Sequence, residues 1–326
     1  MKIFNSVSVI GCGRWGSFLA WYLANYNQNL SKILLYGLES SATFQSLKET
    51  RKNEYLSLPD KIELTADLEY TLKSDCIVIS IDAQNLKYLA KQLNEYKLDG
   101  KTFILAMKGI DVETKQRLSQ VMLSNIKQNI DIAVLLGPGH VEDYTKGIPN
   151  CAVIDGINHN SKRNAVGLFC SRLMKIYYGN DLIGNEIGGA YKNVIGIGAG
   201  ILDGLGWGSL KGALMARSIA EVSKFIEKSG GNRFSASGLS FLGDFEATLF
   251  SKHSNNRMFG ELFLKGETTN KNCEGYYTLK AVYEMAKDFG IDMPITNTLY
   301  YAIYDKKPIA DCIENLFGRD LKGEFE

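Results

Sequence analysis

The sequence predicts an α/β protein, with an N-terminal doubly wound parallel sheet and an all-helical C-terminal domain. In the first half, short apolar runs alternate with helical patterns, and the chain opens with a strand followed by GCGRWG. After about residue 184 the pattern changes to long helices rich in small residues. We therefore predict domains 1–184 and 185–326.

The predicted strands of the first half are mostly continuous apolar runs, as expected for strands that helices cover on both faces. They lie at 6–11, 32–37, 76–81, 102–107, 132–137, 151–156 and 175–179. Apolar residues have helical spacing near 18–26 and 86–93. In the second half, a similar spacing from Met215 to Ile226 predicts a helix that stops at Gly230.

Composition excludes several classes of function. The 326 residues are 45% hydrophobic, enough for two cores. A net charge of +1 gives no electrostatic reason to expect nucleic acid or an anionic membrane as a partner. No apolar stretch reaches about 18 residues, so no integral membrane segment is expected. The 6 cysteines are scattered and the 3 histidines lack cysteines at ligand spacing, so we expect reduced thiols, a cytoplasmic protein and no metal.

The GCGRWG motif follows a strand and opens a helix, which is the context that a dinucleotide-binding fingerprint requires. Gly11 would form the turn, Gly13 would let a pyrophosphate approach, and Gly16 would let the helix pack on the sheet. Arg14 and Trp15 lie at the start of this helix and join the predicted cofactor-binding residues. The motif predicts a Rossmann domain, and a simple packing turn is the alternative.

The end of the second strand should decide between NAD and NADP. Here the sequence reads YGLES, with Glu39 and with no arginine or lysine before Lys48. A carboxylate accepts hydrogen bonds from ribose hydroxyls, so NAD is predicted and NADP is less favoured. The alternative is a solvated carboxylate at the start of a helix.

One lysine lies within a glycine-dense apolar helix, the run EIGGAYKNVIGIGAG at 186–200. Gly188 and Gly196 flank Lys192 by one turn on either side, which would leave space for a small molecule to reach it. Burying a lone ammonium is costly, so such a lysine has a partner, a ligand or a lowered pKa. The alternative is a lysine that merely covers apolar surface.

Further candidates follow predicted strands or lie in the helical half. Lys108 follows the strand at 102–107, at the edge where open parallel sheets bind ligands, unless it is a plain surface lysine. GPGH at 137–140 predicts a turn at the same edge. Asp244 precedes an apolar run. The residues at 254–257 could form an oxyanion or phosphate cradle, or cap a helix.

Taken in order, these motifs resemble the NAD-dependent glycerol-3-phosphate dehydrogenases of bacterial type over essentially the whole chain. The motifs are GCGRWG, AMKGI, GPGH, EIGGAYKNVIGIGAGI, GLSFLGD, NNRMFG, CEG and MPIT. The resemblance implies a Rossmann domain, a helical domain and an active site between them. It also implies NAD(H) as the cofactor and a small phosphorylated substrate.

Carried over residue by residue, the resemblance makes Lys192 the catalytic general acid and base, with Lys108 and Asp244 beside it. The chemistry agrees, because hydride delivery to a ketone requires a proton for the developing alkoxide, and a lysine with a lowered pKa can supply it. Lys108 would polarise the carbonyl and help to lower the pKa of Lys192, and Asp244 would hold the two lysines.

The resemblance also assigns binding residues. Those expected to bind the cofactor, besides Lys108 and the residues at 11–16 and 39, are Val141, Asn255 and Glu274. Those expected to bind the substrate, besides the three catalytic residues, are Gly137, Gly139, Ser254, Asn255, Asn256 and Arg257.

Three departures from the family pattern concern the substrate. Asn255 stands where the family usually has arginine, Gly139 replaces a serine, and 81–83 replace a proline-containing turn. The leading hypothesis is interconversion of dihydroxyacetone phosphate and sn-glycerol 3-phosphate, which feeds glycerophospholipid synthesis. The alternatives are a related dehydrogenase for another small anionic alcohol or ketone, and a non-catalytic NAD-binding regulator. A homodimer is the expected assembly.

Overall fold

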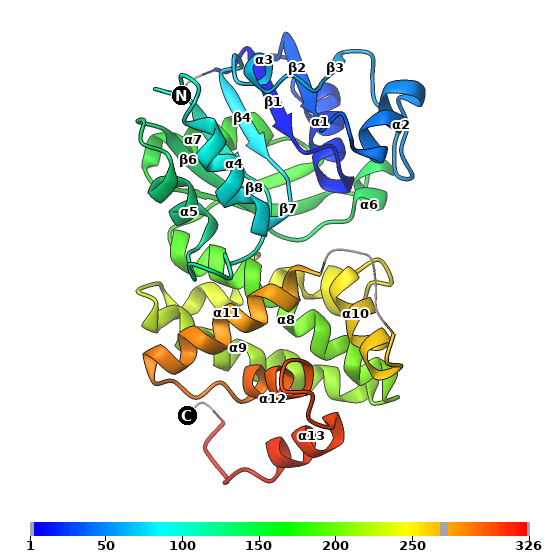
Figure 1. Ribbon diagram of the computed structural model, residues 1–326, viewed down its shortest axis with the longest axis vertical. Helices are drawn as coiled ribbons and strands as arrows, with labels where there is room; N and C mark the ends of the chain where they lie inside the picture. Colours follow the sequence, from blue (N-terminus) through cyan, green and yellow to red (C-terminus); the bar gives the residue numbers. More distant parts are fainter. Residues whose placement is uncertain (1–2, 268–272, 325–326) are drawn as a thin grey trace. The chain divides into compact units, whose positions relative to one another are not determined.

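The computed structural model describes residues 3–267 and 273–324 (Figure 1). The chain divides into two compact units. Unit one comprises Met1–Met107 and Leu118–Leu182, and unit two comprises Lys108–Arg117 and Ile183–Glu326. The segment 108–117 therefore groups with unit two, although the sequence placed it in the first domain. Within the described ranges, no helix is long and apolar enough to cross a membrane.

Unit one is built on an 8-stranded sheet with the order β3-β2-β1-β4-β5-β6-β7-β8. Neighbouring strands are parallel except for β6 and β7, which pair in antiparallel fashion. This confirms the predicted α/β fold class and adds an edge strand that the sequence did not predict, β3. The strands are β1 (Ser6–Ile10), β2 (Lys32–Tyr36), β3 (Ile62–Thr65), β4 (Cys76–Ile79), β5 (Thr102–Leu105), β6 (Asp131–Leu136), β7 (Asn150–Gly156) and β8 (Met174–Tyr178).

The central strands are mostly apolar, as expected where helices cover a sheet on both faces, and β4 and β5 are buried at every position. Alternate residues such as Val7 and Val9 belong to the core that includes the helix α1. The Tyr22 hydroxyl of α1 donates to the carbonyl of Phe169, which ties α1 to α7. The helices are α1 (Arg14–Tyr26), α2 (Ala42–Thr50), α3 (Leu68–Thr71), α4 (Leu86–Leu93), α5 (Leu118–Asn125), α6 (Val141–Thr145) and α7 (His159–Phe169).

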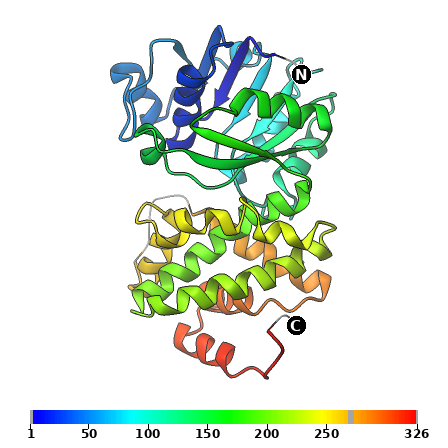
Figure 2. The same cartoon turned by 180° about the vertical axis from the view of Figure 1, so that it is seen from behind.

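The described elements of unit two are helices, as the sequence predicted (Figure 2). The longest, α8, is buried at every position from Gly184 to Ile201, which explains its lack of a polar face. Helix α12 packs against α9, α11 and α13. The helices are α8 (Leu182–Gly204), α9 (Lys211–Lys228), α10 (Asn255–Leu264), α11 (Glu274–Phe289), α12 (Pro294–Ile303) and α13 (Ile309–Phe317).

Glycines set the close crossing of α8 and α10. A Cβ atom at Gly200 would lie 1.9 Å from the carbonyl oxygen of Arg257, and one at Gly260 would lie 2.2 Å from that of Ile197. Only glycine permits backbones to approach this closely. The crossing holds the start of α10 against the middle of α8, where Lys192 lies.

Candidate active site

Three charged side chains of unit two meet at one buried point. The Oδ2 atom of Asp244 lies 2.5 Å from the Nζ atom of Lys108 and 3.0 Å from that of Lys192. Asp244 is 1% exposed and Lys192 is 8% exposed. One carboxylate oxygen thus serves two ammonium groups, and the structure brings together the three residues that the family resemblance grouped.

Lys108 reaches this point because its segment packs with the helices of unit two. Ile110 is fully buried in the helical core. Arg117, at the other end of the segment, forms an ion pair with Glu186 of α8, and both side chains are largely buried. Sequence reasoning missed this pair, although a carboxylate inside the apolar run at 186–200 is a signal that a cation lies nearby.

The carboxylate of Asp244 is presented by an irregular stretch. Asp244 ends the 3-10 turn Leu242–Asp244, and the π-helical turn Glu246–Phe250 follows. Such π turns occur often at functional sites. This turn buries Thr248, whose Oγ1 atom accepts a hydrogen bond from Nζ of Lys192 at 2.7 Å. Sequence reasoning missed Thr248, because a threonine in an apolar run gives no signal of its own.

The glycines on either side of Lys192 accommodate protein atoms. A Cβ atom at Gly188 would lie 3.0 Å from Cβ of Phe241, and one at Gly196 would lie 2.9 Å from Cγ2 of Thr248. The expectation that these glycines leave space for a small molecule is therefore wrong at both positions. They allow the stretch that bears the carboxylate to pack directly on α8.

Burial lowers the pKa of Lys192 from 10.5 to about 8. The charge of Asp244 opposes this shift, and the charge of Lys108 adds to it. With both lysines protonated the group carries one net positive charge, which suits an anionic substrate. A side chain with a pKa near the working pH can both donate and accept a proton, as the predicted role of Lys192 requires.

The predicted phosphate cradle lies at the start of α10. The Oγ atom of Ser254 accepts from the backbone N–H of Arg257 at 3.3 Å, so Ser254 caps this helix. Asn255 is the first residue of the helix. The capping alternative therefore applies to Ser254, and the substrate-binding roles of Ser254 and Asn255 stay predictions.

Asn256 links three helices around the site. Its Nδ2 atom donates to Oδ1 of Asn193, the residue after Lys192, at 3.0 Å. Its Oδ1 atom accepts from the backbone N–H of Gly275 at 2.9 Å, in the first turn of α11 that Glu274 begins. Sequence reasoning missed Asn193, because its partner comes from a distant part of the chain.

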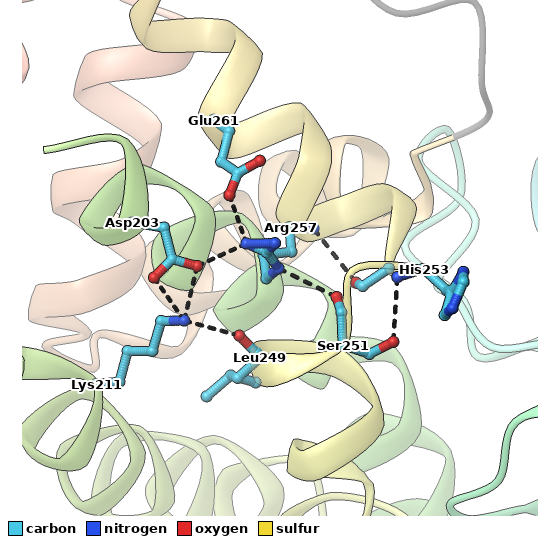
Figure 3. Close-up of polar contacts among 8 residues, drawn as sticks. Asp203, Lys211, Leu249, Ser251, His253, Arg257 and Glu261 are labelled. Carbon is cyan, nitrogen blue, oxygen red and sulfur yellow. Dashed lines mark hydrogen bonds and ion pairs between the residues drawn. The ribbon is translucent and has the colours of Figure 1, made fainter. Parts of the chain in front are cut away.

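Arg257 is held by neighbouring protein groups, as Figure 3 shows. Its Nη1 atom lies 2.7 Å from Oδ2 of Asp203 and also pairs with Glu261, and its Nε atom donates to the carbonyl of Ser251. Lys211 lies 2.6 Å from the other oxygen of Asp203. These contacts tie α8, α9 and α10 together and favour a structural role, so substrate binding by Arg257 stays a prediction.

In unit one, the glycines of GCGRWG differ in their surroundings. Gly11 has φ of +108°, and a Cβ atom there would lie 2.1 Å from the carbonyl oxygen of Ser80. A Cβ atom at Gly16 would lie 1.8 Å from the carbonyl oxygen of Gly11, whereas one at Gly13 would meet no protein atom within 4 Å. Gly13 precedes α1, so the open position lies at a helix N-terminus, where phosphates bind readily.

The other predicted residues around this turn differ in exposure. Arg14 pairs with Glu142 and is partly exposed. The Trp15 ring packs against the core of unit one, 4.9 Å from that of Phe18. Val141 is 2% exposed and belongs to the same core, so its cofactor-binding role stays a prediction.

The GPGH turn explains one departure from the family pattern. Gly137 and Gly139 have φ of +131° and +141°, which disfavours any other residue. A Cβ atom at Gly139 would lie 2.4 Å from the ring of Tyr144. The buried Tyr144 ring therefore fills the space that a serine side chain would need.

Glu39, the predicted ribose ligand, has two neighbours from α2. Its Oε1 atom lies 2.7 Å from Nζ of Lys48 and 3.0 Å from Nε2 of Gln45. The hydrogen bond from Lys48 lowers the pKa of Glu39. The sequence favoured NAD because no arginine or lysine comes before Lys48, but α2 places Lys48 beside the end of β2.

Comparisons with known proteins agree with this architecture. Residues 6–162 match a family model described as NAD-dependent glycerol-3-phosphate dehydrogenase N-terminus, and residues 181–314 match the model of its C-terminus. A glycerol-3-phosphate dehydrogenase (NAD(P)+) of Prosthecochloris aestuarii is 36% identical over 335 residues, which cover 98% of this chain and 99% of that protein. The chain belongs to the NAD-dependent glycerol-3-phosphate dehydrogenase family. It is therefore an oxidoreductase that acts on CH–OH groups with NAD.

Other relatives place the chain in the same family and fold. A glycerol-3-phosphate dehydrogenase (NAD(P)+) of Staphylococcus saprophyticus is 32% identical, covering 98% of this chain and 100% of that protein. A crystal structure of glycerol-3-phosphate dehydrogenase from Coxiella burnetii superposes with a TM-score of 0.88 at 23% identity, covering 98% of this chain and 100% of that one. The sequence matches establish the family, and the structural likeness establishes the fold.

Proposed function

We propose that this chain interconverts dihydroxyacetone phosphate and sn-glycerol 3-phosphate with NAD(H), and that Lys192 is the general acid and base. The observation that supports the residue assignment is the shared carboxylate oxygen of Asp244, 2.5 Å from Lys108 and 3.0 Å from Lys192. Asp244 and Lys192 are buried and Lys108 is partly exposed, and a buried ion pair of this kind is costly to maintain without a function.

The residues of unit one fit the dinucleotide. Gly11 and Gly16 are crowded by backbone, whereas Gly13 is open at the start of α1, which is the pattern that a pyrophosphate-binding turn needs. Gly13 would let the pyrophosphate approach the start of α1, while Gly11 and Gly16 would shape the turn that receives it. Glu39 would hold the adenosine ribose. When bound, NADH supplies the hydride for the ketone carbon.

Lys192 supplies the proton for the ketone oxygen as this oxygen becomes an alkoxide, and it takes the proton back in the reverse direction. An ammonium has three hydrogens. One points to Thr248 and one to Asp244, so the third is left for the substrate. With a pKa of about 8, Lys192 is suited to both directions near neutral pH. Lys108 adds the positive charge that polarises the carbonyl.

The phosphate of the substrate would bind near the start of α10, where the helix dipole favours an anion. Ser254, Asn255 and Asn256 lie there, while Arg257 is engaged with Asp203 and Glu261. A second candidate function follows from Asn255, which stands where the family usually has arginine: a dehydrogenase for another small anionic alcohol or ketone.

The test is the fall in NADH absorbance with dihydroxyacetone phosphate and with a panel of other phosphorylated, phosphonylated and carboxylated ketones. Preferred turnover of dihydroxyacetone phosphate is expected. No turnover of it, with activity elsewhere in the panel, would favour the second candidate. Asn255→Arg should improve dihydroxyacetone phosphate turnover only under the second candidate, and Asn255→Gln controls for the size of the side chain.

We also propose a homodimer in the cytoplasm. The dimer is supported by the general preference of soluble oligomers for closed two-fold dimers. The six cysteines are free, which suits a reducing compartment. Light scattering of the purified protein tests the dimer, because a monomeric mass would contradict it.

A further inference from the structure

We propose that Lys48 allows the nucleotide site to bind NADP(H), because it can leave its ion pair with Glu39 and bind the 2′-phosphate. In this proposal Glu39 accepts the ribose hydroxyls of NAD(H), while Lys48 and Gln45 bind the 2′-phosphate of NADP(H). The proposal rests on the proposed assignment of Glu39 to the adenosine ribose. It assigns a specificity role to a lysine that the sequence alone places too far from the motif.

The contacts place two donors on the same carboxylate oxygen. Nζ of Lys48 lies 2.7 Å from Oε1 of Glu39, and Nε2 of Gln45 lies 3.0 Å from it. Gln45 and Lys48 are three residues apart on α2 and therefore share one face of that helix. Glu39 follows the carboxyl end of β2, the place where this class of sheet binds the adenosine ribose.

The position of Lys48 is fixed by the packing of α2. A Cβ atom at Gly37 would lie 2.4 Å from the Phe44 ring, so the glycine lets α2 fold back closely on the end of β2. Phe44 and Leu47 are buried, at 1% and 0% exposure, and anchor the helix in the core. The exposed face that carries Lys48 is thereby held beside Glu39.

The exposure of the pair makes it easy to open. The side chain of Glu39 is 61% exposed and that of Lys48 is 44% exposed. Ion pairs at this exposure contribute little to stability, so a ligand can separate the two groups at small cost. The pair therefore differs from the buried group at Asp244, where separation of the charges is expensive.

The charge balance explains how one site could take both nucleotides. A lone carboxylate at this position would repel a 2′-phosphate, which is the reason an acidic residue favours NAD. Lys48 neutralises this carboxylate and also offers a charged donor, and Gln45 offers a neutral one. Hydrogen bonds from charged donors to phosphate are among the strong ones. The alternative is a surface ion pair that no ligand touches.

The experiment measures nucleotide binding to the full-length protein by fluorescence titration, with no ketone present. The ligands are NADH, NADPH and the 2′-phosphorylated fragment 2′-phospho-ADP-ribose. Lys48→Gln should weaken NADPH and the fragment by roughly tenfold or more, the loss of one charged hydrogen bond. NADH binding should change little. Glu39→Gln should act in the opposite sense, weakening NADH and strengthening NADPH.

Two control variants separate this effect from general changes of charge. Lys61→Gln removes an exposed lysine at the amino end of β3, whereas Glu39 follows the carboxyl end of the neighbouring parallel strand β2. This variant should leave the ratio of NADPH to NADH affinity unchanged. Lys48→Arg keeps a charged donor and should retain NADPH binding. The kcat/KM values with the two cofactors should follow the same order as the affinities.

The outcomes distinguish this proposal from the proposed function. Wild type that binds NADH but not NADPH, or a Lys48→Gln variant with an unchanged affinity ratio, would overturn the role of Lys48. Wild type that binds neither nucleotide would overturn the ribose assignment on which that role depends. Binding of both nucleotides with a Lys48-dependent ratio supports the role, even if dihydroxyacetone phosphate is not turned over.

Discussion

Replacing Asp244 by asparagine removes the one carboxylate between two ammonium groups while nearly preserving shape. The Oδ2 to Nζ distance from Asp244 to Lys192 is 3.0 Å. At an effective dielectric constant of about 20, two unit charges at this distance interact by about 5.5 kcal/mol. Lys108 shares the same oxygen, and Thr248 and water can relax toward Lys192, so part of this energy is recovered. Loss of only about 1.4 kcal/mol already lowers the Lys192 pKa by about one unit.

The direction of the effect follows from the role of each group. Asp244 raises the pKa of Lys192 against burial, so its loss lowers this pKa from about 8. In ketone reduction Lys192 must hold a proton, so kcat/KM falls as pH rises through its pKa. We expect the alkaline limb of the Asp244→Asn variant to lie at least about one pH unit lower than that of wild type.

The assay is the pH dependence of kcat/KM for dihydroxyacetone phosphate, measured from acidic to alkaline pH at saturating NADH. Asp292→Asn, which removes an exposed carboxylate elsewhere in unit two, is the matched control and should leave the limb unchanged. An alkaline limb of Asp244→Asn at the wild-type pH, or at a higher pH, would refute the coupling of Asp244 to the proton donor.

Three further substitutions test the packing and the sites. Gly13→Ala adds a Cβ atom that meets no protein atom within 4 Å, so the melting temperature should hold while NADH binding weakens; unchanged affinity would place the pyrophosphate elsewhere. Gly200→Ala places a Cβ atom 1.9 Å from the Arg257 carbonyl oxygen and should lower the free energy of unfolding, measured in urea, by about 1–3 kcal/mol. A wild-type denaturation midpoint would contradict this crossing. Thr248→Val removes an acceptor from Lys192 and should move the alkaline limb of kcat/KM to lower pH, and an unmoved limb would exclude Thr248 from the proton transfer.

Much of the fold follows from local sequence. The strands β4 and β5 are largely apolar runs, and the structure buries them at every position. The edge strand β3 escaped prediction because Ile62–Thr65 is short and buried only at Ile62. The antiparallel direction of β7 also could not be predicted, because apolar runs do not encode the direction of pairing.

The sequence predicted those site residues whose charge or polarity differs from that of the neighbouring residues. Lys192 stands out because an ammonium inside an apolar helix is costly. Thr248 and Asn193 fit their local sequence, and their importance arises only from contacts across the fold. The glycines beside Lys192 showed that something must approach α8, but not that protein would fill the space.

In the nucleotide site, too, the local motif was predictable, but a contact between residues distant in sequence was not. The motif at 11–16 predicted a turn at Gly11, close approach of a pyrophosphate at Gly13 and helix packing at Gly16. In the structure Gly11 and Gly16 are crowded by backbone, and a Cβ atom at Gly13 would meet no protein atom within 4 Å. Lys48 lies nine positions after Glu39 in the sequence, and the fold of α2 brings Nζ of Lys48 to 2.7 Å from Oε1 of Glu39. A sequence motif cannot predict cofactor specificity that depends on a residue brought close by the fold.

The most direct test of the central claim is turnover of dihydroxyacetone phosphate by Lys192→Met, measured together with its NADH affinity and melting temperature. The account predicts a loss of roughly 10²–10⁴-fold in kcat with NADH affinity unchanged, the usual contribution of a general acid. Lys224→Met, at an exposed lysine of α9, should behave as wild type. A folded Lys192→Met variant that turns over dihydroxyacetone phosphate at the wild-type rate would contradict the claim.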